Sequence, residues 1–213
     1  MKCAVRWMGW AACAAALAGS VAGVAAAPMV PLSADAQTLL QWVKGSSDNA
    51  GAPFMVIDKH AARLWVFDAR AQPTGSTPVL LGLAVGDDSV PGIGTRPLAD
   101  VQPKERTTPA GRFVIEPGRN TNGEDILWID YDAAVSMHRV RANNPHERRL
   151  QRLATPTAAD NRISYGCVNV PAAFYDKTVG PVFTRAKGLV YVLPEVRPLR
   201  SLLAASAGRA AAP

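Results

Sequence analysis

Apolar and polar residues along this chain alternate mostly in the short period that is typical of β-strands. Runs rich in Val, Ile, Phe and Trp are separated by turn residues, and a run of this kind predicts a strand that packs on a core. The runs cover residues 54–58, 63–68, 79–85, 113–116, 126–130, 135–138 and 189–193. Helical spacing is confined to a few short segments. The pattern therefore predicts a mainly β fold, either a sandwich or a strongly curved sheet, with a few short helices.

Helix signals mark three segments, which are residues 33–44, 144–153 and 171–178. The first segment carries Leu39 and Val43 on one side and stops at a Gly-Ser-Ser sequence. In the second, Asn144 stands at the cap position and Pro145 at the first helical position. In the third, Pro171 suits the first turn of a helix. We also expect the alanine-rich end of the chain after residue 200 to fray.

Two predicted connections, residues 86–108 and 139–163, are long for a compact domain. The first is rich in proline and glycine and has no clear periodicity, which is typical of a lid or a binding loop. The second contains the second predicted helix and a cluster of arginines, Arg139, Arg141, Arg148, Arg149 and Arg152. A solvated helix face explains most of these arginines. The alternative is a binding site for carboxylates, which guanidinium groups bind in a forked geometry.

Composition narrows the class of protein without choosing a function. The chain has 213 residues, of which 48% are hydrophobic and 19% charged, and its mean hydropathy is +0.03. These values exclude a disordered chain and a protein with many membrane spans, and the length fits one domain. A net charge of +6 is compatible with nucleic acid, an anionic wall or a membrane surface as partner.

Residues 1–26 have the features of a secretory signal peptide. Lys2 and Arg6 provide a positive start, and an alanine-rich apolar stretch without acidic residues follows. Small residues precede a cleavage site that we expect after Ala26. The alternatives are an uncleaved anchor helix, since about 18 apolar residues just span a bilayer, and a lipoprotein through Cys13. Cleavage is favoured because small residues dominate the stretch, and contact with the membrane is then expected only during export.

Removal of this segment would leave a single cysteine, Cys167, in an exported chain. It also removes two basic and no acidic residues, so the net charge falls from +6 to +4. A single cysteine excludes an intramolecular disulfide, although the compartment would permit one. A lone thiol in an oxidising compartment either is buried as a small hydrophobic group or does chemistry. Composition leaves these two interpretations equal.

The residues around Cys167 favour chemistry. Gly166, directly before it, allows a positive φ or a close approach of the backbone to a substrate. The helix predicted after Pro171 would turn its positive end towards the thiol and favour the thiolate. Backbone N–H groups around Gly166 and Cys167 would be suited to binding a developing oxyanion.

Three histidines are candidates for the base that such a thiol needs. We expect His60, in a polar turn, and His146, in the arginine-bearing helix, to be exposed. His138 ends an apolar strand before the connection that returns to Cys167, a position where catalytic groups are often mounted. A half-buried structural histidine is the alternative. One cysteine and three scattered histidines provide no ligand pair at metal spacing, so neither a metal nor another cofactor is expected.

The segment Ser-Tyr-Gly-Cys-Val-Asn, residues 164–169, resembles the signature of the L,D-transpeptidases, the YkuD-type catalytic domain. That signature is a histidine, a spacer, and then Ser/Thr-His-Gly-Cys-hydrophobic-Asn. Residues 108–113 resemble the family motif Thr-Pro-x-Gly-x-Phe, and residues 56–67 resemble its first hairpin. The resemblance implies a β-sandwich-like catalytic domain over residues 53–194. Residues 27–52 would form an N-terminal helix and linker, and residues 195–213 a C-terminal tail.

The resemblance also implies a role for each matching residue. Cys167 would be the nucleophile and His138 the general base, with the backbone carbonyl of Arg139 orienting the imidazole. Residues that would shape the oxyanion site are Gly166 and Tyr165. Residues that would bind substrate are Ser164, Asn169 and Arg141.

The chain departs from the family pattern in two ways. Tyr165 stands where the family has a second histidine, and a tyrosine hydroxyl donates a hydrogen bond but does not become a cation. Between His138 and Tyr165 there are 26 residues, a longer spacer than the family has. The excess matches the arginine-bearing helix, which we interpret as an insertion beside the site. Together these departures suggest a non-standard acceptor.

The resemblance implies a periplasmic enzyme that cross-links the stem peptides of peptidoglycan through a cysteine acyl-enzyme. If water replaced the acceptor amine, the same site would act as an L,D-carboxypeptidase or endopeptidase. A catalytically silent wall-binding module is the third interpretation, and Tyr165 alone favours it. Nucleic-acid binding fits poorly with an exported chain that lacks a basic motif with interleaved aromatic residues. The sequence makes no prediction about the oligomeric state.

Overall fold

The computed structural model describes residues 30–185 and 187–210. The predicted signal peptide, residues 1–26, lies outside the described residues. None of the helices within the described ranges combines the length and the apolar character needed to cross a bilayer.

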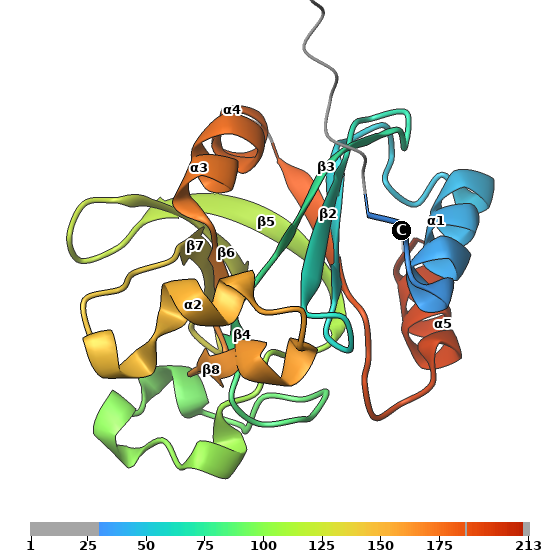
Figure 1. Cartoon of the computed structure of the whole chain (residues 1–213). Helices are drawn as coiled ribbons and strands as arrows, with labels where there is room; N and C mark the ends of the chain where they lie inside the picture. Colours follow the sequence, from blue (N-terminus) through green and yellow to red (C-terminus); the bar gives the residue numbers. More distant parts are fainter. Residues whose placement is uncertain (1–29, 186, 211–213) are drawn as a thin grey trace, which may run out of the picture.

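Eight strands form the central sheet, in the order β3-β2-β1-β10-β5-β6-β7-β9 (Figure 1). Their bounds are β1 Phe54–Asp58, β2 Arg63–Phe67, β3 Pro73–Pro78, β5 Gly111–Arg119, β6 Asp125–Asp130, β7 Val135–Arg139, β9 Val168–Val170 and β10 Gly188–Val192. The pairs β1/β10 and β7/β9 are parallel, and the other neighbours are antiparallel. A small second sheet pairs β4 with β8 in parallel, Leu81–Gly82 with Arg162–Ser164. The predicted mainly β class is confirmed.

Strand β5 joins two halves of the sheet. It pairs with β10 over residues 111–115 and with β6 over residues 116–119, so it changes its partner halfway along. A strand that passes from one sheet to another forms the corner in sandwich-like folds. The half that contains β6, β7 and β9 is therefore set apart from the half that contains β1, β2 and β3.

The central strands are apolar throughout because both of their faces are buried. In β1, Phe54 and Val56 belong to one hydrophobic core, and Met55 and Ile57 belong to the other. Successive side chains of a strand point to opposite faces, so one continuous apolar run contributes to two cores. The sequence run 54–58 is therefore a strand between two covering layers.

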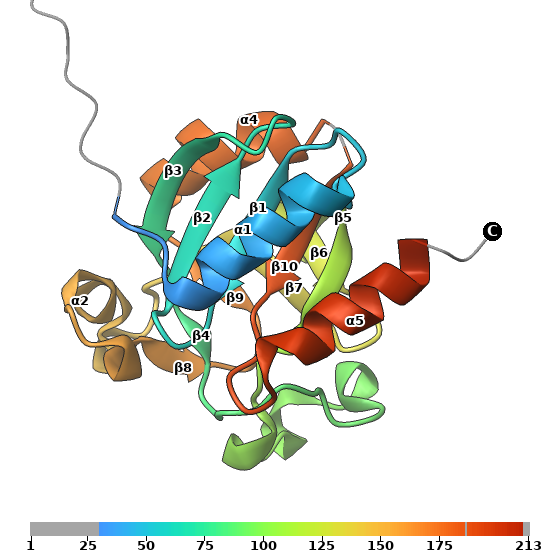
Figure 2. The same cartoon turned by 90° about the vertical axis from the view of Figure 1, so that its right-hand side faces the viewer.

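One face is covered by α1, Ala34–Ser46, and α5, Leu199–Ala210, which lie side by side in Figure 2. The side chain of Ser33 caps α1, as the predicted start of this helix requires. Leu39 is fully buried and Leu202 is 6% exposed, and both contribute to the same core. The expectation that the chain frays after residue 200 is therefore wrong, because the core holds α5.

The opposite face is covered by the helical segment that follows Pro171. It comprises α3, Ala172–Phe174, a π-helical stretch η6, Tyr175–Val179, and α4, Gly180–Phe183. The side chains of Tyr175, Val179 and Phe183 are fully buried against the sheet. This helix was predicted, and it extends beyond residue 178 because its buried side chains continue to Phe183.

The arginine-bearing helix is present but broken. Asn144 caps it by accepting a hydrogen bond from the amide of His146 at 3.1 Å. A single 3₁₀ turn, η4 at Pro145–Glu147, is separated from α2 at Arg149–Ala154 by Arg148, whose φ is +50°. A left-handed residue cannot continue a helix, so the predicted single helix is two short pieces.

Apart from α2, the two long connections contain short 3₁₀ turns. Those in the first are η1 Ile93–Thr95, η2 Leu98–Asp100 and η3 Pro103–Glu105, and the second ends with η5 Ala158–Asn161. The predicted strand over residues 79–85 is reduced to β4, whereas β3, β8 and β9 were not predicted. Strand β3 contains two prolines and no apolar run, and β8 and β9 have three residues each, too few for a pattern.

Candidate active site

Cys167 lies on a tight loop between β8 and β9. The hydroxyl of Ser164 donates to the carbonyl of Cys167 at 2.6 Å and accepts from the amide of Gly166 at 3.1 Å, so it ties the loop together. Gly166 has a φ of +128°, and a Cβ there would lie 2.8 Å from the carbonyl oxygen of Thr107. Only glycine fits this position, so Gly166 has both the positive φ and the close approach expected of it.

Strand pairing brings His138 to the thiol. Strands β7 and β9 are parallel, with His138 opposite Asn169, two residues after Cys167. The imidazole of His138 lies near enough to the thiol to lower its pKa, and its Nδ1 lies 2.8 Å from the carbonyl oxygen of Arg139. A carbonyl only accepts hydrogen bonds, so Nδ1 carries the proton and Nε2 is the basic nitrogen. The long spacer does not separate the pair.

The surroundings of Cys167 favour its thiolate. Burial alone would raise its pKa, but the neighbouring His138, together with Ser136, lowers the pKa below the ordinary value. The amide nitrogen of Ser136 lies 3.4 Å from Sγ, and its hydroxyl lies 3.6 Å away. Ser136 was not predicted, although its place two residues before His138 puts it on the same face of β7.

The helix dipole does not act as the sequence suggested. Strand β9 stands between Cys167 and α3, so the thiol is not at a helix start. The lowered thiol pKa comes from His138 and Ser136 instead.

The other two histidines, His60 and His146, are both exposed, as expected.

Tyr165 carries a positively charged partner. Its side chain is 38% exposed, and the guanidinium carbon of Arg106 lies 3.9 Å from the centre of its ring. Arg106 also donates to the carbonyl of Val101 at 3.1 and 3.3 Å, which fixes the guanidinium over the ring. A cation therefore lies over the ring of Tyr165, two residues before Cys167, and tyrosine alone could not supply one. Arg106 comes from the first long connection, and no sequence motif identified it.

Ser164 and Asn169 are buried beneath the loop, 3% and 1% exposed. The side-chain Nδ2 of Asn169 donates to the carbonyl of Cys167 at 3.2 Å, and its Oδ1 accepts a hydrogen bond from Arg149 of α2. Both side chains hold the loop, and a substrate would reach them only by displacing it. The structure thus gives them a supporting position in the loop, and the substrate contact expected of them stays a prediction.

A pocket of about 280 Å³ opens beside His138. Ile126 and Trp128 form its apolar walls, and Arg119 and Arg141 bring positive charge to it. Arg141, which was expected to bind substrate, forms an ion pair with Glu124 here. Two guanidinium groups beside an apolar wall suit a ligand that carries carboxylates.

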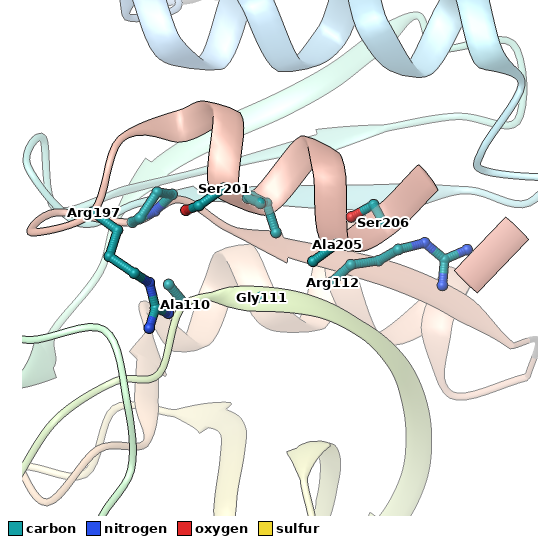
Figure 3. A pocket seen from close by; sticks show the side chains of 9 residues that line it. Ala110, Gly111, Arg112, Arg197, Ser201, Ala205 and Ser206 are labelled. Carbon is teal, nitrogen blue, oxygen red and sulfur yellow. The ribbon is translucent and has the colours of Figure 1, made fainter. Parts of the chain in front are cut away.

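Another cavity, of about 320 Å³, lies between the start of β5 and α5 (Figure 3). Its arginines are Arg112, paired with Asp48, and Arg197, paired with Asp88. It shares no lining residue with the pocket beside His138. It is therefore separate from the thiol site.

No family model and no curated protein matches the chain. Among solved structures, the chain is similar to a mutant L,D-transpeptidase from Enterococcus faecium, at 16% identity and a TM-score of 0.38, over 67% of this chain and 50% of that one. It is similar to the L,D-transpeptidase (Yku) from Stackebrandtia nassauensis, at 16% identity and a TM-score of 0.40, over 69% and 57%. The helical cell shape determining protein Pgp2 from Campylobacter jejuni is 14% identical with a TM-score of 0.42, over 68% and 49%.

The chain thus spans roughly half of the length of these solved structures. At such identities and TM-scores the likeness says nothing about the reaction. The reaction has to be argued from the site.

Proposed function

We propose that this protein is a cysteine L,D-transpeptidase that acts on the stem peptides of peptidoglycan in the periplasm. One observation carries the proposal: the parallel pairing of β7 and β9 brings His138 beside the Cys167 thiol, whose pKa it lowers, and the carbonyl of Arg139 holds the imidazole. Cys167 lies in the loop whose sequence resembles the family signature, and His138 lies at the end of the neighbouring strand β7. Export would depend on residues 1–26.

In the first half-reaction, Nε2 of His138 takes the thiol proton and Sγ attacks the carbonyl of the diamino-acid residue in the donor stem. Backbone N–H groups around Gly166 and Cys167 would hold the oxygen of the tetrahedral intermediate. As the intermediate collapses, the C–N bond to the terminal D-amino acid breaks, and the leaving amine receives the proton from His138. A thioester on Cys167 remains.

In the second half-reaction, the amine of an acceptor stem attacks the thioester. His138 takes the proton of that amine, the C–S bond breaks, and Cys167 leaves as the thiolate. The product is a cross-linked pair of stems. With water as acceptor, the same steps would give a shortened stem instead.

The pocket beside His138 supports stem peptides as substrates. These peptides carry several carboxylates, and Arg119 and Arg141, which line the pocket, would bind them. Trp128 and Ile126 would pack against the apolar parts of the stem. Arg106 adds a cation over the ring of Tyr165, two residues before the nucleophile.

Incubation with purified muropeptides tests the proposal. Mass spectrometry should detect a cross-linked dimer and the released D-amino acid, and the Cys167→Ala variant should form neither. A shortened monomer without a dimer would show that water is the acceptor. If the wild-type protein leaves the muropeptides unchanged, and a carbapenem adds no mass to it, the enzyme proposal is refuted in favour of a silent wall-binding module.

A further inference from the structure

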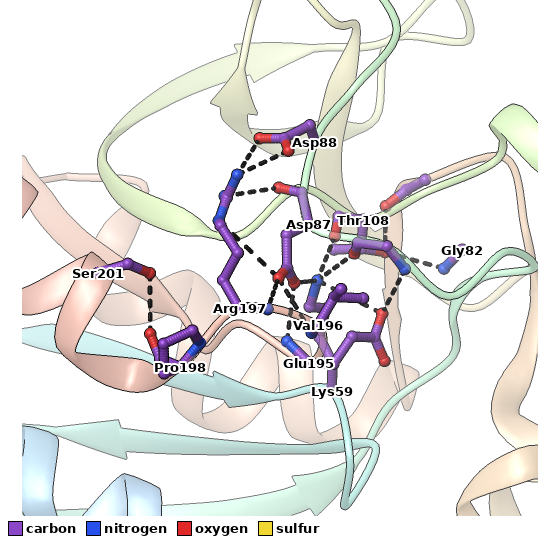
Figure 4. Close-up of polar contacts among 12 residues, drawn as sticks. Lys59, Gly82, Asp87, Asp88, Thr108, Glu195, Val196, Arg197, Pro198 and Ser201 are labelled. Carbon is purple, nitrogen blue, oxygen red and sulfur yellow. Dashed lines mark hydrogen bonds and ion pairs between the residues drawn. The ribbon is translucent and has the colours of Figure 1, made fainter.

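Lys59 lies at the centre of a buried charged cluster that the site chemistry does not use (Figure 4). Its side chain is fully buried, and those of its partners Asp87 and Glu195 are each 2% exposed. The ammonium group donates to Asp87 at 2.9 Å and lies 3.4 Å from Glu195. Lysine is almost never buried in this way without such partners.

The cluster consists of Lys59, Asp87, Glu195 and Arg162, and its charges balance. Arg162 is 12% exposed and pairs with Glu195. Asp87 also accepts from the amides of residues 195, 196 and 197, at 2.7, 3.0 and 2.6 Å. Loss of one member would leave an uncompensated buried charge, so the cluster is a rigid anchor.

One contact leads from this anchor towards the thiol. Besides its carboxylates, Lys59 donates to the carbonyl of Thr108 at 3.0 Å. The hydroxyl of Thr108 accepts from the amide of Gly82 and donates to the carbonyl of Gly166, both at 2.8 Å. An amide only donates and a carbonyl only accepts, so the direction of both bonds is fixed. Thr108 is fully buried.

The segment 106–108 is packed without slack between two glycines. A Cβ on Gly82 would lie 2.4 Å from the carbonyl oxygen of Arg106. On the other side, a Cβ on Gly166 would lie 2.8 Å from that of Thr107. Neither glycine leaves room for the segment to shift. The hydroxyl of Thr108 is therefore presented to Gly166 in one position.

This position matters because the carbonyl of Gly166 belongs to the peptide group that contains the N–H of Cys167. A trans peptide is planar, and its C=O and N–H point in opposite directions. Fixing the carbonyl therefore also fixes the N–H. We propose that Thr108, anchored by the Lys59 cluster, is a positioning residue that aims the Cys167 N–H at the developing oxyanion, an inference that rests on the proposed function.

Two reactions of the same thiol separate this role from others. Acylation by a carbapenem forms a bond from Sγ to the β-lactam carbonyl and breaks the ring C–N bond, whose nitrogen takes up the proton. It passes through an oxyanion. Alkylation by iodoacetamide needs only the thiolate, which displaces iodide. A misdirected oxyanion donor should therefore slow the first reaction and spare the second.

The variants are Thr108→Val, which keeps the shape and loses the hydroxyl, and Thr108→Ser, which keeps the hydroxyl. For Thr108→Val we expect the acylation rate constant to fall about 10- to 100-fold, because the donor is misdirected and not removed. The rate and the pH profile of alkylation should match those of the wild type. Thr108→Ser should restore acylation.

Three results would overturn the inference. If Thr108→Val is acylated at the wild-type rate, Thr108 does not position the donor, while the proposed function stands. If acylation and alkylation slow together, the hydroxyl serves only the integrity of the loop. If the wild-type protein is alkylated but never acylated, the proposed function fails and the inference fails with it.

Discussion

Asp87 and Cys167 are two groups whose pKa values the fold lowers, and it surrounds them differently. Burial opposes ionisation of Asp87, but the amides of Arg197 and Glu195 and the ammonium of Lys59 lower its pKa to about 2. Its two oxygens accept from three amides and an ammonium group, at 2.6 to 3.0 Å. The carboxylate of Asp87 therefore has no free hydrogen-bonding capacity for a reaction.

Cys167 is also favoured as an anion, but its partners hold it loosely. Sγ has contacts of 3.4 and 3.6 Å with Ser136, and the residue is only partly buried. Its strongest partner, His138, is itself able to take and return a proton. The comparison teaches that an anion with all of its hydrogen bonds made stabilises a fold, whereas an anion beside a partner that exchanges protons is available for chemistry.

The largest expected effect comes from removing the reactive thiol of Cys167. Cys167→Ala should lower the rate of muropeptide turnover at least about 1000-fold, because no other group can form the acyl-enzyme. The same variant should change the free energy of unfolding by less than about 1 kcal/mol, since the thiol contacts are long. Product mass and urea unfolding measure the two quantities. A large loss of stability would mean that Cys167, like Asp87, is part of the framework.

Removal of the proton-exchanging partner, His138, should have the next largest effect. His138→Gln should lower the acylation rate about 100-fold or more, through loss of the general base. It should also raise the thiol pKa, because His138 is the main group that lowers it. The midpoint of the pH profile of iodoacetamide alkylation reports that pKa. An unchanged midpoint would assign the lowering to Ser136 alone.

In the buried cluster around Asp87, Lys59→Met should lower the free energy of unfolding by about 3 to 5 kcal/mol, because it leaves two buried carboxylates without their ammonium. The matched control is Asp88→Asn at the exposed pair with Arg197, which should cost less than about 1 kcal/mol. Urea denaturation measures both. Equal losses would contradict the distinction between the buried cluster and the surface pair.

The smallest effect is the acid sensitivity of Asp87. Its folded pKa is lowered to about 2, below the unfolded value, so its contribution is present above about pH 4 and is lost as the pH falls towards 2. That contribution is about 2 kcal/mol. Free energies of unfolding at pH 5 and pH 2.5, for the wild type and Asp87→Asn, should converge at the lower pH. If the free energies of unfolding of the two proteins differ by the same amount at both pH values, Asp87 is not the source of the acid sensitivity.

The sequence pattern predicted the elements whose side chains meet a core on both faces. The run 54–58 and the helix capped by Ser33 are local signals, and they coincide with β1 and α1. Helix α5 could not be predicted, because the apolar side chains that hold it, such as Leu202, are few among alanines and gain their partners only in the tertiary structure. Strand β3 is an edge strand without an apolar face and gives no pattern.

The candidate site divides in the same way. Cys167, Gly166 and His138 could be named from a local motif and from one strand end. Lys59 directly precedes the exposed His60 in a polar stretch of the sequence, yet it is 1% exposed, because its carboxylate partners come from distant segments. Arg106 likewise meets Tyr165 only through the folded loop. Contacts between segments far apart in the chain produce no local sequence pattern from which they could be predicted.

Strands β7 and β9 are paired in parallel, and a parallel pair requires a crossover connection between its strands. The arginine-bearing segment is that crossover, and both of its ends return to a fixed ladder. Lengthening such a connection is inexpensive, at about 0.6 kcal/mol for each doubling. The distance between imidazole and thiol is therefore independent of the number of residues between them. New recognition residues could be inserted in this crossover, by evolution or by protein engineering, without moving the reacting atoms.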